Sequence, residues 1–196
     1  MAREAYVAVI LRRGPSGWYQ LIEWNTRRDM FSDGAWFKGR IYEEKCDLSP
    51  DGQLFLCFCF QGSRLSTDYT DSWTAVSRSP YLYALALWPS GTTYGGGGRF
   101  VSNRGVMLRT RLAPVAHRQH PGRGLEVTTG GPAVHRSSAE VDDADWCGRD
   151  QGGCLVFTRA GKLYRRRGEE DLLLGDFDER TPDPAPAPKW AKMPLR

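Results

Sequence analysis

The side chains of this sequence that could bind a metal ion are its cysteines and histidines. Cys57 and Cys59 alternate along an apolar run, so both should point to one face of a strand. Zinc knuckles place paired cysteines about two to four residues apart on a turn, whereas Cys-Phe-Cys in an apolar run is typical of small buried side chains. We therefore expect no metal ion and no cofactor. The other candidate ligands are Cys147, Cys154, His117 and His120.

A thiol nucleophile is the second possible chemistry. Cys147 stands beside Asp145 and Trp146, and the distant His135 could act as its base. The chain has no Gly-x-Ser-x-Gly elbow and no His-Glu-x-x-His motif, and nothing in the sequence brings these residues together. A hydrolase with a metal or thiol centre is kept as the alternative, and the sequence leans away from an enzyme.

Four consecutive glycines offer backbone N–H groups beside a cation, which is the chemistry of a phosphate cradle. A phosphate loop needs a helix after the glycines, and here Phe100 and Val101 follow. Glycines also let a strand bend or pack closely against another backbone. On the rim of a sheet, such a stretch can belong to a binding surface. One half of the predicted surface is therefore Tyr94, Gly95, Gly96, Gly97, Gly98 and Arg99.

The other half of the predicted surface is a long segment, Ala113–Ser138, which carries all three histidines and has no aromatic residue. It is expected to be a loop inserted between strands. Loops of this length are uncommon in compact domains unless they are functional or disordered. The candidate binding residues here are His117, His120 and His135.

Charge restricts the kind of partner only weakly. The net charge is +4, and the basic residues are scattered along the chain. The triplet Arg165–Arg167 is closely followed by Glu169, Glu170 and Asp171, which partly cancel it. Nucleic-acid binding is the second alternative. Clustered aspartates, such as Asp142 and Asp143, are typical of solvated turns.

Strands must position these residues. The 22 glycines and 12 prolines of the chain rule out a long helical bundle, because neither residue type suits a helix interior. Ala5–Leu11, Leu54–Phe60 and Tyr81–Trp88 are continuous apolar runs of strand length, which indicates burial on both faces. At most one or two helical turns are expected.

A Pro-x-Gly turn recurs at Pro15, Pro50 and Pro89, a period of about 40 residues, which is the spacing of propeller blades. Proline presets φ for such a turn, and glycine accepts a positive φ. A degraded fourth copy, Arg149–Gly152, precedes an apolar stretch that begins at Cys154.

The segment Leu48-Ser-Pro-Asp-Gly-Gln-Leu-Phe-Leu56 resembles the turn and strand of WD-repeat and related bacterial β-propellers. Cys154–Arg165 is similar to a strand, hairpin and Leu-Tyr strand of the same proteins. These motifs cover about a tenth of the chain, and no Trp-Asp dipeptide closes a blade. The resemblance implies a small or incomplete propeller whose rim tryptophans bind partners. The candidate rim residues are Trp24, Trp36, Trp73 and Trp88.

The sequence thus predicts an all-β chain of propeller-like β-meander repeats, with a β-sandwich as the alternative. Residues 1–180 are expected to form a single all-β domain with an inserted loop at 113–144, and residues 181–196 a proline-rich tail. The absence of a long apolar run argues against a membrane partner, and the odd cysteine count without a signal peptide favours the cytoplasm. The expected function is a non-catalytic binding or scaffolding module whose partner is another protein.

Overall fold

The computed structural model describes residues 1–62, 68–110, 113–130 and 140–195. In these ranges the chain forms fifteen strands and no α-helix, which confirms the all-β prediction. No helix in this part of the chain is both long and apolar enough to cross a membrane. Three short 3-10 helices are present: η1 (Pro15–Gly17), η2 (Glu43–Lys45) and η3 (Lys189–Lys192).

The strands form four sheets that follow one another along the chain and are largely antiparallel. The first sheet contains β1 (Val7–Arg13), β2 (Trp18–Asn25) and β3 (Met30–Lys38). The second contains β4 (Arg40–Ile41), β5 (Asp47–Leu48), β6 (Leu54–Phe60), β7 (Ser72–Arg78) and β8 (Ala86–Pro89). The third contains β9 (Gly98–Phe100), β10 (Gly105–Leu108) and β11 (Glu126–Thr129). The fourth contains β12 (Trp146–Arg149), β13 (Leu155–Arg159), β14 (Lys162–Arg167) and β15 (Glu170–Asp176).

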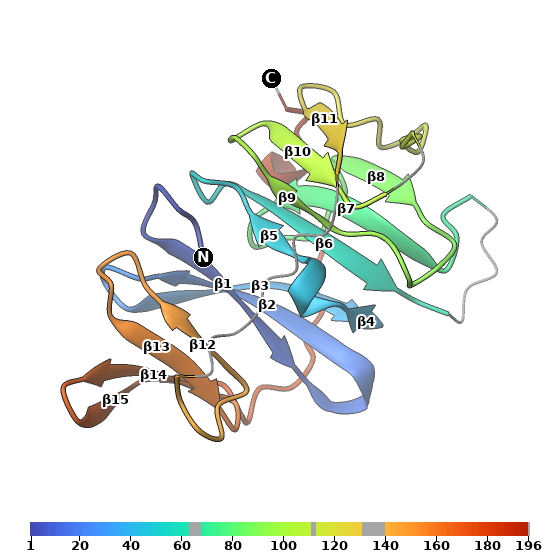
Figure 1. Cartoon of the computed structure of the whole chain (residues 1–196). Helices are drawn as coiled ribbons and strands as arrows, with labels where there is room; N and C mark the ends of the chain where they lie inside the picture. The colour runs from blue at the N-terminus through green and yellow to red at the C-terminus, as the bar shows by residue number, and fades with distance from the viewer. Residues whose placement is uncertain (63–67, 111–112, 131–139, 196) are drawn as a thin grey trace.

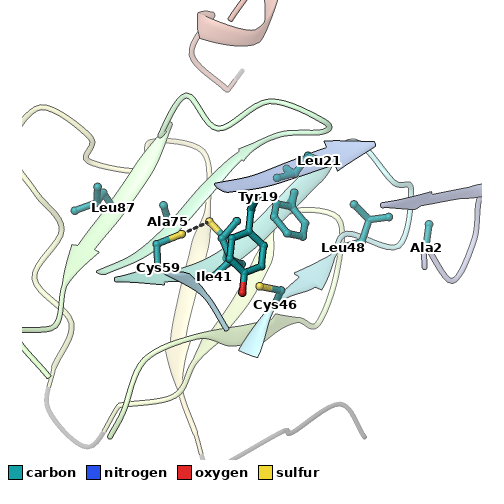
Figure 2. Close-up of a cluster of buried hydrophobic side chains, with 11 residues drawn as sticks. Ala2, Tyr19, Leu21, Ile41, Cys46, Leu48, Cys59, Ala75 and Leu87 are labelled. Atoms are coloured by element: carbon teal, nitrogen blue, oxygen red, sulfur yellow. Dashed lines mark hydrogen bonds between the residues drawn. The ribbon is translucent and has the colours of Figure 1, made fainter. Parts of the chain in front are cut away.

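Three buried apolar clusters hold these sheets together, and each lies between two of them. Tyr19 and Cys57 belong to the cluster between the first and second sheets (Figure 2). Val76 and Phe100 belong to the cluster between the second and third, and Trp24 to the one between the first and fourth. The sheets therefore stand in the order fourth, first, second, third, from the orange strands at the lower left of Figure 1 to the yellow-green strands at the upper right.

Strand β6 shows why the sequence builds these layers. Its alternate residues Leu54 and Leu56 enter the cluster facing the third sheet, while Phe55 and Cys57 enter the cluster facing the first. Side chains alternate across a strand, so a continuous apolar run is buried on both faces. The prediction for Leu54–Phe60 is confirmed.

The run Tyr81–Trp88 is a strand only in its last part, β8. The Tyr81 amide donates a hydrogen bond to the Arg78 carbonyl, which closes a turn around Pro80. Tyr81 then packs edge-on against Trp190 of the tail, with ring centroids 5.5 Å apart. A strand was wrongly predicted for residues 81–85. Their apolar side chains pack on the tail and against the clusters between the sheets, but the backbone after the turn at Pro80 does not join a strand before Ala86.

The three Pro-x-Gly segments are turns with glycine at positive φ, as predicted: Gly17 at 74°, Gly52 at 76° and Gly91 at 64°. Their places in the fold differ. The first joins β1 to β2 and the second joins β5 to β6, whereas the third follows β8 and leads into the glycine stretch. The near-constant spacing therefore does not mark the same step in every sheet.

The long inserted segment contains a strand that the sequence prediction missed. β11 pairs with β10 in parallel, and all four of its residues are exposed. Val-Thr-Thr is β-branched and suits a strand, but the segment is only four residues long and shows no apolar alternation, so it was not recognised. In the tail, Ala191 and Leu195 are buried, while Trp190, which packs on Tyr81, is half exposed.

Candidate functional site

The structure brings parts of the two predicted surface segments together across one groove. Gly95, Gly96 and Gly97 form one wall, and residues 113–118 form the other. Buried side chains of Thr74, Trp88 and Leu108 close the bottom. The groove has a volume of about 810 Å³ and lies beside the face of the second sheet that looks toward the third.

The glycine wall depends on two residues that cannot carry a side chain. Gly96 and Gly97 have φ of 79° and 76°, which L side chains rarely adopt. A Cβ on Gly96 would lie 2.0 Å from the buried Phe58 ring, and one on Gly97 would lie 2.5 Å from the Lys45 carbonyl oxygen. The close-packing role proposed for these glycines is confirmed.

The amides of this wall are already engaged. The Gly96 N–H donates to the Arg109 carbonyl at 3.1 Å, and the Gly97 N–H donates to Thr74 Oγ1 at 2.8 Å. They are therefore not free to cradle a phosphate, and β9, rather than a helix, follows them.

Lys45 fixes the wall from below. Its Nζ donates to the carbonyls of Thr93 at 2.7 Å and Gly95 at 3.1 Å, and it lies 4.6 Å from the centre of the Phe58 ring. Burial lowers the pKa of Lys45, and the nearby cation of Arg109 lowers it further. An anion in the groove would relieve this repulsion between the two cations.

Apolar side chains at the groove and next to it are exposed to solvent. Tyr94 is 94% exposed beside the glycine wall, and Val115 is 80% exposed on the opposite wall. Arg109 and Arg118 contribute cations to the lining, and Asp68 is paired with Arg118 at 3.1 Å. Tyrosine and arginine are residue types that anchor protein–protein interfaces.

Two of the predicted histidines lie in one aromatic stack. The rings of Tyr69 and His117 stack with centroids 4.2 Å apart, and His120 lies 5.5 Å from His117. Hydrogen bonds hold this segment along β8: the His117 amide donates to the Leu87 carbonyl, and the Leu87 amide donates to the His120 carbonyl. His117 lines the groove, whereas His120 lines a separate cavity.

Tyr94, which precedes the glycine wall in the sequence, is not part of the groove lining, and neither are Gly98 and Arg99. Gly98 and Arg99 belong to β9; the Gly98 backbone packs on Met107, and the exposed Arg99 donates to Met107 Sδ at 3.8 Å. His135 lies outside the described residues.

The structure gives little support to the alternatives, a metal or thiol centre and a basic surface for nucleic acid. Cys147 is buried on β12 of the fourth sheet, far along the chain from the histidines beside β8. No disulfide joins any of the five cysteines, and within the described ranges no three His, Cys, Asp or Glu side chains come together as a metal site. Arg165 is buried against Asp29 and Asp150, and Arg166 pairs with Asp171, which removes much of the charge that a nucleic acid would meet.

Sequence reasoning missed the residues that complete the groove. Thr74, Leu108 and Lys45 carry no motif, and long-range packing alone brings them to the glycines. Trp88 was named as a rim tryptophan, and the structure places it, largely buried, in the groove lining. Trp73 lines the separate cavity, and Trp24 is buried between the first and fourth sheets.

No protein-family model, no curated protein and no solved structure matches this chain. The resemblance to WD-repeat propellers therefore stays a prediction from short motifs, and function has to be argued from the groove.

Proposed function

We propose that this protein is a non-catalytic binding module that holds an extended, acidic segment of a partner protein in the groove between residues 95–97 and 113–118. The observation that carries this proposal is the groove itself, which combines a backbone wall, exposed apolar side chains and an excess of cations.

The charges favour an acidic occupant. Arg109 and Arg118 face the groove and Lys45 lies beneath it, whereas Asp68 is the one acid among the described residues of the lining. Because Arg118 and Asp68 are well exposed, their attraction is screened, and a partner carboxylate can compete for Arg118. We expect affinity to fall as the salt concentration rises.

The shape favours an extended peptide. Glycines present no side chains, so a partner backbone can approach the wall closely. Val115 in the lining and the exposed Tyr94, next to the glycine wall in the sequence, can cover an apolar side chain of the partner. A partner with a bulky apolar residue between acidic ones would use both features.

The test is fluorescence anisotropy with the labelled peptide Glu-Glu-Asp-Leu-Phe-Asp-Glu-Glu and its counterpart in which lysine replaces every acid. We expect the acidic peptide to bind and the basic one not to. Arg118→Glu should weaken binding about tenfold, since it replaces an attraction with a repulsion. Arg28→Glu, an exposed change in the first sheet, is the matched control. Equal binding of both peptides, or equal losses in both variants, would refute the groove as an acidic-peptide site.

We also propose that the four sheets are the blades of an incomplete propeller. One feature supports this over a sandwich. Sheets adjacent in the chain are packed together from the first to the third, and the fourth sheet packs on the first, as the last blade of a propeller does. The antiparallel neighbours within each sheet fit both architectures.

A further inference from the structure

A second, more enclosed cavity lies on the opposite face of β7 from the groove. It has a volume of about 450 Å³ and opens at the end of the cluster between the first and second sheets. Figure 2 shows this end of the cluster, where Cys59, Ala75 and Leu87 lie together, away from Leu48 and Ala2. The size is in the range of small-molecule sites.

Aromatic rings supply much of the cavity wall. Phe37 and Trp73 meet edge to face with centroids 6.3 Å apart, and Tyr69 and Tyr83 line the side near His120. Rings in this arrangement offer both faces and edges to another ring. The wall is thus suited to a flat, apolar molecule.

The lining excludes a charged ligand. Among the described residues of the lining, no side chain is Asp, Glu, Lys or Arg. His120 donates a hydrogen bond from Nδ1 to the Ala84 carbonyl at 2.7 Å, and its Nε2 lies 3.3 Å from the Tyr69 hydroxyl. Both ring nitrogens of His120 are therefore engaged by neutral groups. An ion entering this cavity would lose its hydration without gaining a counter-charge.

One buried polar group in the lining is unsatisfied. Ser77 is 1% exposed, and its Oγ has no hydrogen-bond partner among the described residues. It lies on the same face of β7 as Trp73 and Ala75. Buried hydroxyls nearly always have a partner, so an unsatisfied one in a cavity wall indicates a missing polar atom.

We propose that this cavity binds an uncharged aromatic molecule that carries one hydroxyl or carbonyl group. Its ring packs among Phe37, Trp73 and Tyr83, and its polar group pairs with Ser77 Oγ. This site lies apart from the groove, so it stands or falls independently of the proposed peptide binding.

The experiment is isothermal titration calorimetry of the full chain with 2-naphthol, naphthalene and the anionic 2-naphthol-6-sulfonate. We expect 2-naphthol to bind at least tenfold more tightly than the sulfonate. Ser77→Ala should weaken 2-naphthol about fivefold, the value of one hydrogen bond, and leave naphthalene unchanged. Failure of 2-naphthol to bind at millimolar concentration, or a sulfonate of equal affinity, would overturn the proposal.

A cavity-filling variant locates the ligand. Ala75→Leu places a larger side chain in the wall and should abolish 2-naphthol binding, while Val115→Ala in the groove should not affect it. Thermal melts show whether Ala75→Leu is folded; if it is not, the Ser77→Ala comparison decides. Unchanged binding in a folded Ala75→Leu protein would place the ligand elsewhere and refute this site.

Discussion

The two faces of strand β7 lead to sites of opposite character. Trp73, Ala75 and Ser77 face the enclosed cavity, whereas Thr74, between the first two, faces the groove. The alternation of a strand thus separates the two sites by the thickness of one sheet. Neighbouring residues in the sequence serve different surfaces.

The two sites also differ in the parts of the chain that line them. Side chains make the cavity, and the part of its wall that the structure describes has no Asp, Glu, Lys or Arg. Backbone makes one wall of the groove, and arginines border it. A cavity of side chains selects by fit and by the hydrogen bonds it leaves open, whereas a backbone wall with exposed cations selects by chain shape and charge. The same sheet can therefore support a small ligand on one face and a peptide on the other.

The largest expected effect tests whether the groove really depends on its backbone wall. Gly96→Ala should lower the free energy of unfolding by about 3 kcal/mol, because it combines a positive φ with overlap of the buried Phe58 ring. Gly95→Ala is the matched control: its Cβ would meet only the Arg109 carbonyl oxygen, at 3.7 Å, and should change stability by less than about 0.5 kcal/mol. Urea denaturation measures both. Equal stabilities of the two variants would show that the wall is not closely packed.

The next effect concerns Tyr19, a buried residue of the cluster between the first and second sheets. Burial, reinforced by the Glu43 carboxylate, raises the pKa of Tyr19 to about 12. The folded protein then keeps a proton that the unfolded chain releases near its ordinary pKa of about 10. Stability should therefore be complete below that pH and fall by about 2.5 kcal/mol as the pH rises through 12.

The comparison of Tyr19→Phe with wild type isolates the contribution of Tyr19 to the pH dependence of stability. Urea denaturation between pH 9 and 12 should give a shallower decline for Tyr19→Phe, which has no proton to lose. Tyr6→Phe, at a half-exposed tyrosine of the N-terminal segment, should follow wild type. Parallel curves for wild type and Tyr19→Phe would mean that Tyr19 titrates as it does in the unfolded chain.

The sequence was sufficient to predict features that depend on neighbouring residues. It was insufficient to predict contacts between residues far apart in the chain. The apolar run Leu54–Phe60 predicted a strand buried on both faces, and Pro50–Gly52 predicted a turn, because each depends on neighbours in the chain. β11 was missed because its partner β10, rather than its own pattern, makes it a strand. The glycine segment was found, but its contact with Phe58 and Lys45 depends on packing between residues about 40 or more positions apart.

The same limit applies to the cavity. Cys57 and Cys59 were correctly predicted to share a face, and their Sγ atoms lie 3.5 Å apart. Nothing in the sequence marked Ser77, because the lack of a partner for a hydroxyl is a property of the finished packing. His117 and His120 were both chosen as surface residues, and only the fold shows that they line different sites.

The smallest expected effect is the sharpest test of the difference between the two faces. Ser49 and Ser77 are both buried serines of the second-sheet region, but Ser49 Oγ donates to Asp51 Oδ1 at 2.6 Å and accepts from the Leu54 amide at 2.9 Å. Ser49→Ala should cost about 1.5 kcal/mol, since it leaves the buried Leu54 amide without its acceptor. Ser77→Ala should change the stability of the ligand-free protein by less than about 0.5 kcal/mol, because it breaks no bond within the protein.

A loss at Ser77 as large as that at Ser49 would mean that its hydroxyl has a partner within the protein, and the cavity would then lose the polar group assigned to its ligand. A Ser77→Ala protein that is equally stable, yet binds 2-naphthol more weakly, would separate the two roles of a buried hydroxyl. The serine would contribute to recognition without contributing to folding, which is the signature expected of a residue kept for a ligand.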